Sequence, residues 1–514
     1  MDLKLNRNEI TLCDIASMSG EQSFESDILL PDYYEDIMKI LKCAVSPEIL
    51  KTNASGDRIT IEGIVVSKIY YQSIENEIRT IQTKTNFSKV FEIRNSLDNV
   101  YPKATIFLDY VNCRAINERR MDVKGALSIK LKLFCNNKES IMIQADGLGL
   151  QTKNNKISNM VVRGSNNNTF TIKEDIELPN NKPDIGNIIR YNVTTNLTDK
   201  KIINNKIIFK GDVKLDILYS PFDNDLEPMF ETFYLSMSQI IDLPGLDEAC
   251  ECELSCKFIW AEITPRADSN GRNRLISAEL NFNVGAKAHN EIETNIIVDA
   301  YSTVMNTHCS RKSLNCYKIL NYINEKIAIS DIVNTSYNNL KIYDMWNTPR
   351  LVIAKKVDGE ILIEGKSEIS ILCKDGNAPI YLEKTIDFET RVPIDVCNQN
   401  NENMQFDLDV ETISMSYEVN YDSINIKVDL AVKGYVYQNK IQNVLSNIEV
   451  DESQPKNRAD RDSLIVYYAQ PGEDVWELAK EYNTSSSAIL VENEGLEEGI
   501  IKENRMLLIP IVVN

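Results

Sequence analysis

The segment Lys206–Ser220, KIIFKGDVKLDILYS, has a regular hydrophobic pattern from which a fold class can be predicted. Apolar side chains fall at alternate positions, and most of the positions between them are charged. Alternation with a period of two is typical of an antiparallel strand with one buried and one solvated face. Gly211 inside this strand predicts a bulge or a close approach of two backbones. The side chains expected to face inward are Ile207, Phe209, Val213, Leu215, Ile217 and Tyr219.

The same strand pattern occurs three times along the chain. Arg58–Gln72 and Glu360–Lys374 align with it on their central glycines, which are 148 and 154 residues apart. A period of this length suits tandem domains better than a short solenoid repeat. We therefore predict a mainly β chain with three tandem antiparallel β-sandwich-like domains and a small β-α-α-β domain at the end. The expected boundaries are residues 1–155, 156–300 and 301–450 for the three repeats, 451–463 for a charged linker and 464–514 for the last domain.

A second shared signal precedes the glycine strand in the first two repeats. The segments DILLPDYYEDIMKIL (27–41) and DIELPNNKPDIGNII (175–189) each place a Leu-Pro pair so that its leucine lies 33 residues before the glycine. A tyrosine, Tyr71 or Tyr219, follows each glycine by eight residues. With these motifs, the two repeats resemble the SPOCS domain of spore-forming Firmicutes, which implies a role in spore-coat morphogenesis. The third repeat lacks the Leu-Pro pair and has Cys373 in place of the tyrosine, so it resembles a divergent member.

The last fifty residues follow a different pattern. A short strand at 464–469 and another at 505–513 flank two short helical patterns, the first of which Asp474 can cap. The apolar face of that first helix has the spacing i, i+3, i+4, i+7 and comprises Val475, Leu478, Ala479 and Tyr482. The segment closely resembles a LysM domain in Gln470-Pro471-Gly472, Val475-Trp476, Leu478-Ala479, Tyr482, Ile489, Asn493 and Leu508-Ile509-Pro510.

LysM domains usually bind N-acetylglucosamine polymers between the loop after the first strand and the loop after the second helix. In these loops, Glu473-Asp474 replaces the usual Asp-Thr, and Lys502-Glu503-Asn504 stands in place of a Pro-Gly-Gln turn. The whole architecture is similar to that of the SipL-type coat-morphogenetic proteins of clostridia. This resemblance implies a non-catalytic scaffold that binds, through its LysM domain, the morphogenetic ATPase on the forespore outer membrane and tethers coat layers there. The alternative is a LysM protein that recognises N-acetylglucosamine polymers of peptidoglycan or spore cortex.

Trp476 lies about 100° around the helix from Val475, off the expected apolar face. We interpret its indole as an anchor for the protein partner, while the alternative is that it covers the small core of the module. The residues expected to bind the partner are Leu464, Val466, Gly472, Asp474, Val475, Trp476 and Asn493. Other coat proteins are further expected partners, and self-association is left open.

The formal net charge of −20 disfavours a nucleic-acid binder, which needs a basic surface, and docking on anionic lipid. The N-terminal stretch MDLKLNRNEITLC lacks the apolar segment of a secretory signal, and no apolar run is long enough to insert into a membrane. Eleven cysteines without such a signal indicate reduced thiols. We expect the protein in the mother-cell cytoplasm, recruited to the outer surface of the forespore.

Residues that could carry catalysis are scarce. His289 and His308 are the two histidines of the sequence, and no phosphate-binding loop occurs. Cys250, Cys252 and Cys256 alternate on one face of an expected strand, which favours buried apolar thiols over a metal site. We therefore predict no enzyme, no cofactor and no metal.

Overall fold

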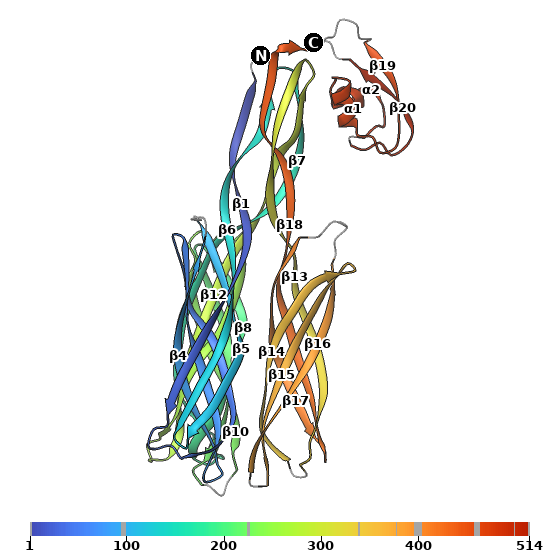
Figure 1. The fold of residues 1–514 in the computed structure, drawn as a ribbon. Coiled ribbons are helices and arrows are strands. Elements are labelled where there is room, and N and C mark those ends of the chain that lie inside the picture. Colours follow the sequence, from blue (N-terminus) through green and yellow to red (C-terminus); the bar gives the residue numbers. More distant parts are fainter. Residues whose placement is uncertain are drawn as a thin grey trace.

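The computed structural model of the protein describes residues 3–93, 99–223, 227–337, 340–376, 378–394, 403–456, 463–497 and 499–511. Long strands dominate this part of the chain, and its two short helices lie near the C-terminus (Figure 1). The prediction of a mainly β protein is confirmed.

Eighteen strands form six three-stranded antiparallel sheets, which pack in pairs as three units. The first unit contains β1 (Lys4–Leu29), β2 (Ile37–Ser55), β3 (Arg58–Ser73), β4 (Ile78–Glu92), β5 (Val100–Asn117) and β6 (Arg120–Asp146). The second contains β7 (Leu150–Glu177), β8 (Ile185–Ile203), β9 (Lys206–Pro221), β10 (Met229–Asp242), β11 (Glu251–Ala267) and β12 (Asn273–Ser302). The third contains β13 (Met305–Asn334), β14 (Leu340–Val357), β15 (Glu360–Asp375), β16 (Ala378–Pro393), β17 (Met404–Val419) and β18 (Ser423–Pro455). In every unit one sheet has the strand order first-sixth-fifth and the other has the order second-third-fourth.

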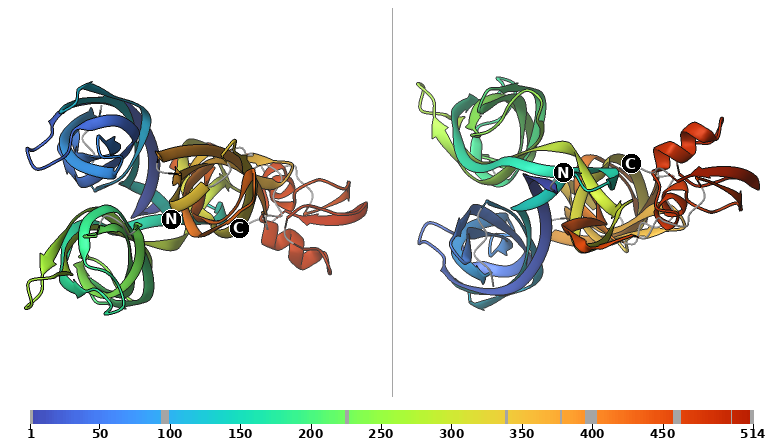
Figure 2. Two further views of the ribbon diagram at one scale, coloured as in Figure 1. Left: turned by 90° about the horizontal axis from the view of Figure 1, so that it is seen from below. Right: turned by 90° about the horizontal axis from the view of Figure 1, so that it is seen from above.

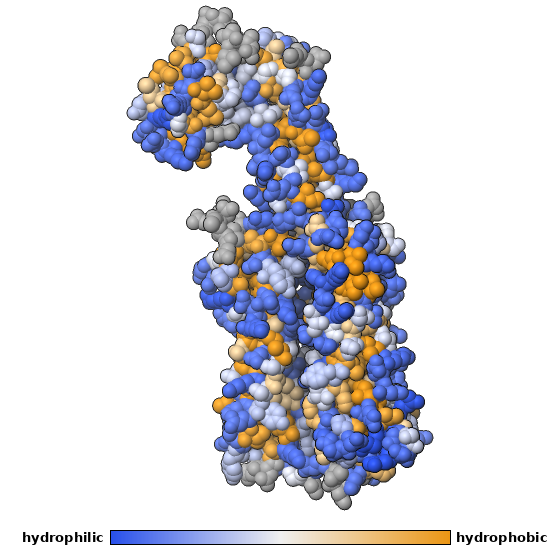
Figure 3. All heavy atoms as spheres, turned by 180° about the vertical axis from the view of Figure 1, so that it is seen from behind, coloured by the Kyte–Doolittle hydropathy of each residue, from blue (hydrophilic) through white to orange (hydrophobic). Residues whose placement is uncertain are grey.

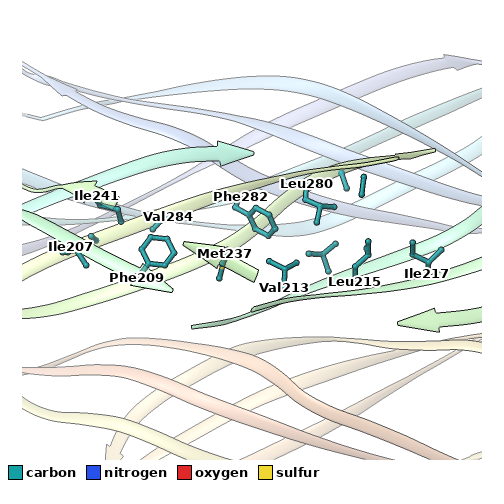
Figure 4. Packing of buried hydrophobic residues seen from close by; sticks show 14 of the residues in the cluster. Ile207, Phe209, Val213, Leu215, Ile217, Met237, Ile241, Leu280, Phe282 and Val284 are labelled. Atoms are coloured by element: carbon teal, nitrogen blue, oxygen red, sulfur yellow. The ribbon is translucent and has the colours of Figure 1, made fainter. Parts of the chain in front are cut away.

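The alternating strand Lys206–Ser220 lies in β9, at the centre of its sheet. Its six predicted inward side chains are all fully buried, and they pack against side chains of β12 such as Phe282 (Figure 4). The prediction for this face is confirmed. On the opposite face Asp216 is also buried, contrary to the expected solvated position. Hydrogen bonds from Lys214 and Thr232 to its carboxylate offset the cost of burying this charge.

The glycines of the three repeats allow close backbone approach, as predicted. Each lies opposite a register shift in the preceding strand, at Ile49/Lys51, Leu197/Asp199 and Leu351/Ile353. A Cβ atom on Gly211 would lie 2.5 Å from the carbonyl oxygen of Asn196, closer than two such atoms can approach. The bulge in one strand and the glycine in its neighbour therefore occur together, because only glycine leaves room for the bulged backbone.

The Leu-Pro segments of the first two units fold as loops that are tied to the tyrosine of the glycine strand. Tyr71 donates a hydrogen bond to the carbonyl oxygen of Glu35 at 3.1 Å, and Tyr219 donates one to that of Pro183 at 3.2 Å. In the third unit Cys373 takes the tyrosine position and is buried. The third unit therefore lacks both the Leu-Pro motif and the tyrosine. In the first two units the tyrosine side chain holds the Leu-Pro loop, so the two features are expected to be lost together.

The first and last strands of the units extend beyond the sheets and form a shaft (Figure 1). Each unit contributes one two-stranded antiparallel ribbon, β1–β6, β7–β12 and β13–β18. One buried cluster in the shaft takes side chains from all six strands, namely Leu12, Ile141, Ile157, Ile296, Leu314, Cys316 and Val444. The sequence did not predict these extensions.

The three units lie side by side around the long axis (Figure 2). Lys103 of the first unit lies 2.7 Å from Glu253 of the second and 2.9 Å from Asp407 of the third. Burial alone would raise the pKa of Asp407, but Lys103 and other nearby lysines lower it to about 2. A second junction joins Arg190 to Asp344 by a buried ion pair. Charged contacts at two levels therefore hold the units as one body.

The expected boundaries differ from the bounds of the strands. β7 begins at Leu150, before the expected boundary at residue 155, and β18 continues to Pro455. The prediction of a linker from residue 451 is therefore wrong for Asp451–Pro455, because this segment belongs to β18. Asp451 pairs with Asn306 and Pro455 pairs with Met305, with a register shift between the two pairs. The side chains of this segment are exposed and mostly polar, so the sequence shows no alternation that would indicate a strand. Residues 457–462 of the expected linker lie outside the described residues.

Candidate protein-interaction surface

The C-terminal module follows the order β19 (Leu464–Ala469), α1 (Val475–Glu481), α2 (Ser486–Glu492) and β20 (Arg505–Pro510). β19 and β20 pair as antiparallel neighbours, and both helices pack on one face of this hairpin. The core contains Ala469, Val475, Leu478, Ala479, Ile489, Leu507 and Ile509. Asp474 caps α1 by accepting a hydrogen bond from the backbone of Trp476, as predicted.

Two residues expected to bind a partner instead hold the module together. Val475 is completely buried in the core. Asn493 is also buried, and its amide bridges the backbone of Ile489 and Leu508 through three hydrogen bonds of 2.7–2.8 Å. Their assignment to a partner surface is wrong. An asparagine in this position satisfies backbone groups at the end of α2 and on β20.

Trp476 is also buried, but the module alone does not cover it. The indole packs edge-on against Tyr301 of β12, with ring centroids 4.9 Å apart. Its Nε1 donates a hydrogen bond of 2.9 Å to Asp299, also on β12. Only 7% of this residue is exposed, so the expected role as a free anchor for a partner is wrong in this arrangement. The prediction that Trp476 lies outside the module's own helical face agrees with its position at this contact.

Asp299 is the electrostatic centre of the contact between the module and the shaft. Besides Trp476, it binds Lys480 of α1 at 2.7 Å and Arg311 of β13 at 2.7 Å. Burial by itself raises the pKa of Asp299, but the hydrogen bonds from Lys480 and Trp476 outweigh it and lower the pKa below its usual value. Asp299 therefore remains ionised while the module is docked.

Two further contacts fix the orientation of the docked module. Lys153 of β7 lies 2.7 Å from Asp474, the residue that caps α1. Tyr301 donates a hydrogen bond of 2.7 Å to the carbonyl oxygen of Thr484, between the helices. Nothing in the local sequence around Lys153 or Asp299–Tyr301 signals this role, because the module that they contact lies more than 150 residues away in the sequence.

The opposite side of the module is an exposed apolar face on the hairpin. Leu464, Val466 and Tyr468 of β19 point to this side by strand alternation, with exposed fractions of 45%, 63% and 70%. Met506, opposite Tyr468 on β20, is 60% exposed. Figure 1 shows the hairpin on the side of the module away from the shaft, and Figure 3 shows apolar residues at the module's surface. We call these four residues the hairpin face.

The loops that would form a glycan groove are bonded to each other. Gly472 and Ile501 join through a backbone hydrogen bond of 2.9 Å, and Ile501 returns one of 2.8 Å to Glu473. A third backbone bond of 3.0 Å runs from Val475 to Gly499. Gly472 has a φ of 100°, which a side chain would strain, so it serves the turn into this pairing.

The histidine and cysteine positions considered as reactive groups are spread over the chain. His289 is buried at the base of the shaft, where burial and the nearby Lys287 lower its pKa and keep it neutral. Cys250, Cys252 and Cys256 belong to the hydrophobic core of the second unit, as predicted. Across the described ranges, no three His, Cys, Asp or Glu residues come together in a way that could hold a metal ion.

Within the described residues, neither helix is long and apolar enough to cross a membrane.

Comparison with known proteins gives a match for the first two units. No curated protein and no solved structure matches the chain. Residues 36–116 and 184–265 each match the family model for the SipL SPOCS domain. The two matches run from the start of the second strand to near the end of the fifth strand in their units, β2–β5 and β8–β11. The first and second units are therefore similar to the SipL SPOCS domain, and this similarity suggests a role associated with the spore coat.

Proposed function

We propose that this protein is a non-catalytic scaffold of the spore coat. Its C-terminal LysM-type module binds the morphogenetic ATPase that coats the forespore outer membrane, and its β units tether coat layers there. The third unit is a divergent SPOCS domain in this proposal. The scaffold acts from the mother-cell cytoplasm, without nucleic acid, cofactor or direct membrane insertion.

The observation that carries the proposal is the match of two regions to the SipL SPOCS domain. This domain suggests a role associated with the spore coat. The arrangement of the units supports a scaffold, because ion pairs such as Lys103 with Glu253 and Asp407 join all three into one body. A joined body can hold bound proteins at fixed distances from one another.

The hairpin face supports protein binding by the module. Its exposed side chains, Leu464, Val466, Tyr468 and Met506, lie next to one another on two paired strands. A contiguous apolar patch of this kind is typical of a protein contact. The paired loops at Gly472 and Ile501 favour this reading over glycan binding, because main-chain hydrogen bonds already join the two sides of the expected groove.

A binding assay with the full-length chain tests the proposal. We expect the immobilised protein to bind the purified forespore ATPase and to show no saturable binding to chitin oligomers or peptidoglycan fragments. Val466→Asp should weaken ATPase binding at least about tenfold, since a charge in an apolar contact costs more than about 1.4 kcal/mol. Ile240→Asp is the matched control, because Ile240 is an equally exposed β-branched residue on β10. Saturable glycan binding without ATPase binding would replace the proposal with the alternative.

A further inference from the structure

β10 is the fourth strand of the second unit and forms one edge of its sheet. It pairs with β9 on one side, and no strand of the described residues pairs with its other side. Its register with β9 is regular from Met229 to Asp242. An edge of this kind presents a row of unpaired backbone N–H and C=O groups. β10 can therefore accept a further strand.

The equivalent edge strands of the other two units, β4 and β16, carry more charged side chains. Those of β4 are Arg79, Lys84, Lys89 and Glu92. Those of β16 are Glu383, Lys384, Asp387, Glu389 and Arg391. β10 contains only Glu231 and Asp242, and it has no lysine, arginine or proline. Because lysine and other charges on an edge strand oppose pairing with another chain, β10 is the least protected of the three edges.

The outer faces of β4 and β16 are also in contact with a neighbouring unit. Lys84 of β4 lies over the aromatic ring of Trp260, which belongs to β11 of the second unit. Glu383 of β16 forms an ion pair of 2.6 Å with Lys42, which belongs to β2 of the first unit. The side chains on these two edges therefore take part in the contacts that join the units.

On β10 the same face is open to solvent. Tyr234 occupies the position of Lys84 in the repeat, because both lie opposite the third residue after the repeat glycine. Phe230, Tyr234 and Ile240 are between 47% and 72% exposed. The uncharged residues between them on this face are Thr232, Ser236 and Ser238. The open edge therefore carries a row of exposed side chains that is partly apolar and has no charge.

The residues of β10 are complementary to themselves in the antiparallel direction. When Leu235 of one copy lies opposite Leu235 of another, Phe230 of each copy lies opposite Ile240 of the other. Aromatic and β-branched side chains directly opposite each other stabilise an antiparallel pair. In the same register Glu231 lies opposite Gln239, so like charges do not face each other. The strand therefore matches a second copy of itself in both apolar contacts and charge.

We propose that β10 pairs with β10 of a second copy of this chain, antiparallel and about a two-fold axis at Leu235. The three-stranded sheets of the two copies then continue as one sheet, in which each edge satisfies the backbone groups of the other. A single strand pair is a small interface, which is typical of transient association. This contact is independent of the proposed function, because it rests only on an edge of the second unit.

Sedimentation velocity of the full-length protein at about 1–100 µM tests the proposal, and we expect a monomer–dimer equilibrium in this range. Tyr234→Lys introduces the residue that β4 has at this position and should raise the dissociation constant at least about tenfold. Val90→Lys is the matched control, because Val90 is the exposed β4 residue at the repeat position of Ile240. It should leave the equilibrium unchanged. A chain that stays monomeric throughout, or equal association of Tyr234→Lys and the unchanged protein, would overturn the proposal.

A cysteine on the two-fold axis tests the register. Leu235→Cys places two thiols directly opposite each other, where a mild oxidant should join them. Mass spectrometry should then find the peptide with this substitution linked to itself, a product that arises only between two chains. Ser236→Cys should give several-fold less of the corresponding product, because its partner in this register is Tyr234 and the two new thiols lie diagonally apart. Preferential linkage in Ser236→Cys, or no self-linkage in either variant, would contradict the proposed pairing.

Two further variants separate this contact from the hairpin face. Ile240→Asp places a carboxylate in the paired edge and should weaken self-association at least about tenfold, with binding of the forespore ATPase retained. Val466→Asp should have the opposite pattern, because Val466 lies on β19 in the C-terminal module. Loss of self-association in Val466→Asp, together with its retention in Ile240→Asp, would assign the contact to the hairpin face and overturn the proposal.

Discussion

The two sides of the C-terminal module are both apolar, but the chain uses them differently. On the helix side, Trp476 is 7% exposed because Tyr301 and Asp299 of β12 cover it. On the hairpin side, Val466 and Tyr468 are 63% and 70% exposed, and nothing in the described residues covers them. A large apolar residue outside the module's own core is therefore no sign, by itself, of an external partner. The open side is the better candidate for binding, and Trp476 is a positioning residue that fixes how this side is presented.

The largest expected effect concerns the helix side. Trp476→Ala removes a buried aromatic contact and the hydrogen bond to Asp299, which together should destabilise docking by about 3 kcal/mol. We expect small-angle X-ray scattering to show a broader distance distribution. Hydrogen exchange should still protect Leu507 and Ile509 in the core of the module. Tyr468→Ala is the control and should leave the scattering unchanged, whereas an unchanged profile for Trp476→Ala would mean that this contact does not hold the module.

The next effect concerns the hairpin side. Tyr468→Asp should reduce binding of the forespore ATPase at least about tenfold, for the same reason as a charge at Val466. Because Tyr468 is 70% exposed, its replacement should change the free energy of unfolding by no more than about 0.5 kcal/mol. Surface plasmon resonance and chemical denaturation measure the two quantities. Full ATPase binding by both charged variants would remove the hairpin face from the partner surface.

Acid should affect the helix side more than the hairpin side. The pKa of Asp299 is lower in the docked state than in a free carboxyl group, so its contribution is complete above about pH 4. The contribution is lost as the pH falls through the lowered pKa, and the module should then dock more weakly. Small-angle X-ray scattering between pH 7 and pH 3 measures this change. Asp407 has a pKa of about 2 and stays ionised in this range, so its ion pairs still join the three β units. Asp299→Asn should dock more weakly at pH 7 and lose most of the pH dependence; an unchanged pH profile would contradict this role.

The smallest effect is expected at the rim of the docking contact. Lys153 and Asp474 form an ion pair of 2.7 Å in which the lysine side chain is 40% exposed. Such a pair contributes about 0.5 kcal/mol and is screened by salt. Lys153→Ala should therefore shift the distance distribution slightly at low ionic strength and not at 0.5 M salt, a concentration of roughly 4 Å screening length. A change as large as that of Trp476→Ala would place the energetic centre of the contact at Lys153.

Local sequence patterns predicted the strands whose buried and exposed faces are determined by packing within their own unit. The inward face of β9 was readable because its buried and exposed sides differ at every second residue. The shaft could not be predicted in this way, because residues such as Leu12 and Val444 pack on strands of other units. Their own strands therefore show little alternation of apolar and polar residues. The same limit applies to the module: the sequence placed Trp476 off the core face, but its partner Tyr301 lies 175 residues away. Asn493 was misassigned because motif membership does not tell a backbone-bridging amide from a ligand-binding one.

Hydrogen exchange of the full-length protein, alone and bound to the forespore ATPase, tests most directly whether the hairpin face is the partner surface. We expect slower exchange on binding in peptides covering β19 and β20, with the β12 peptide around Tyr301 unchanged. Val466→Asp should abolish this protection, and Ile240→Asp should leave it intact. Protection confined to α1, together with faster exchange around Tyr301, would contradict the assignment of the hairpin face as the partner surface. That result would show that the partner displaces the shaft and binds Trp476 itself.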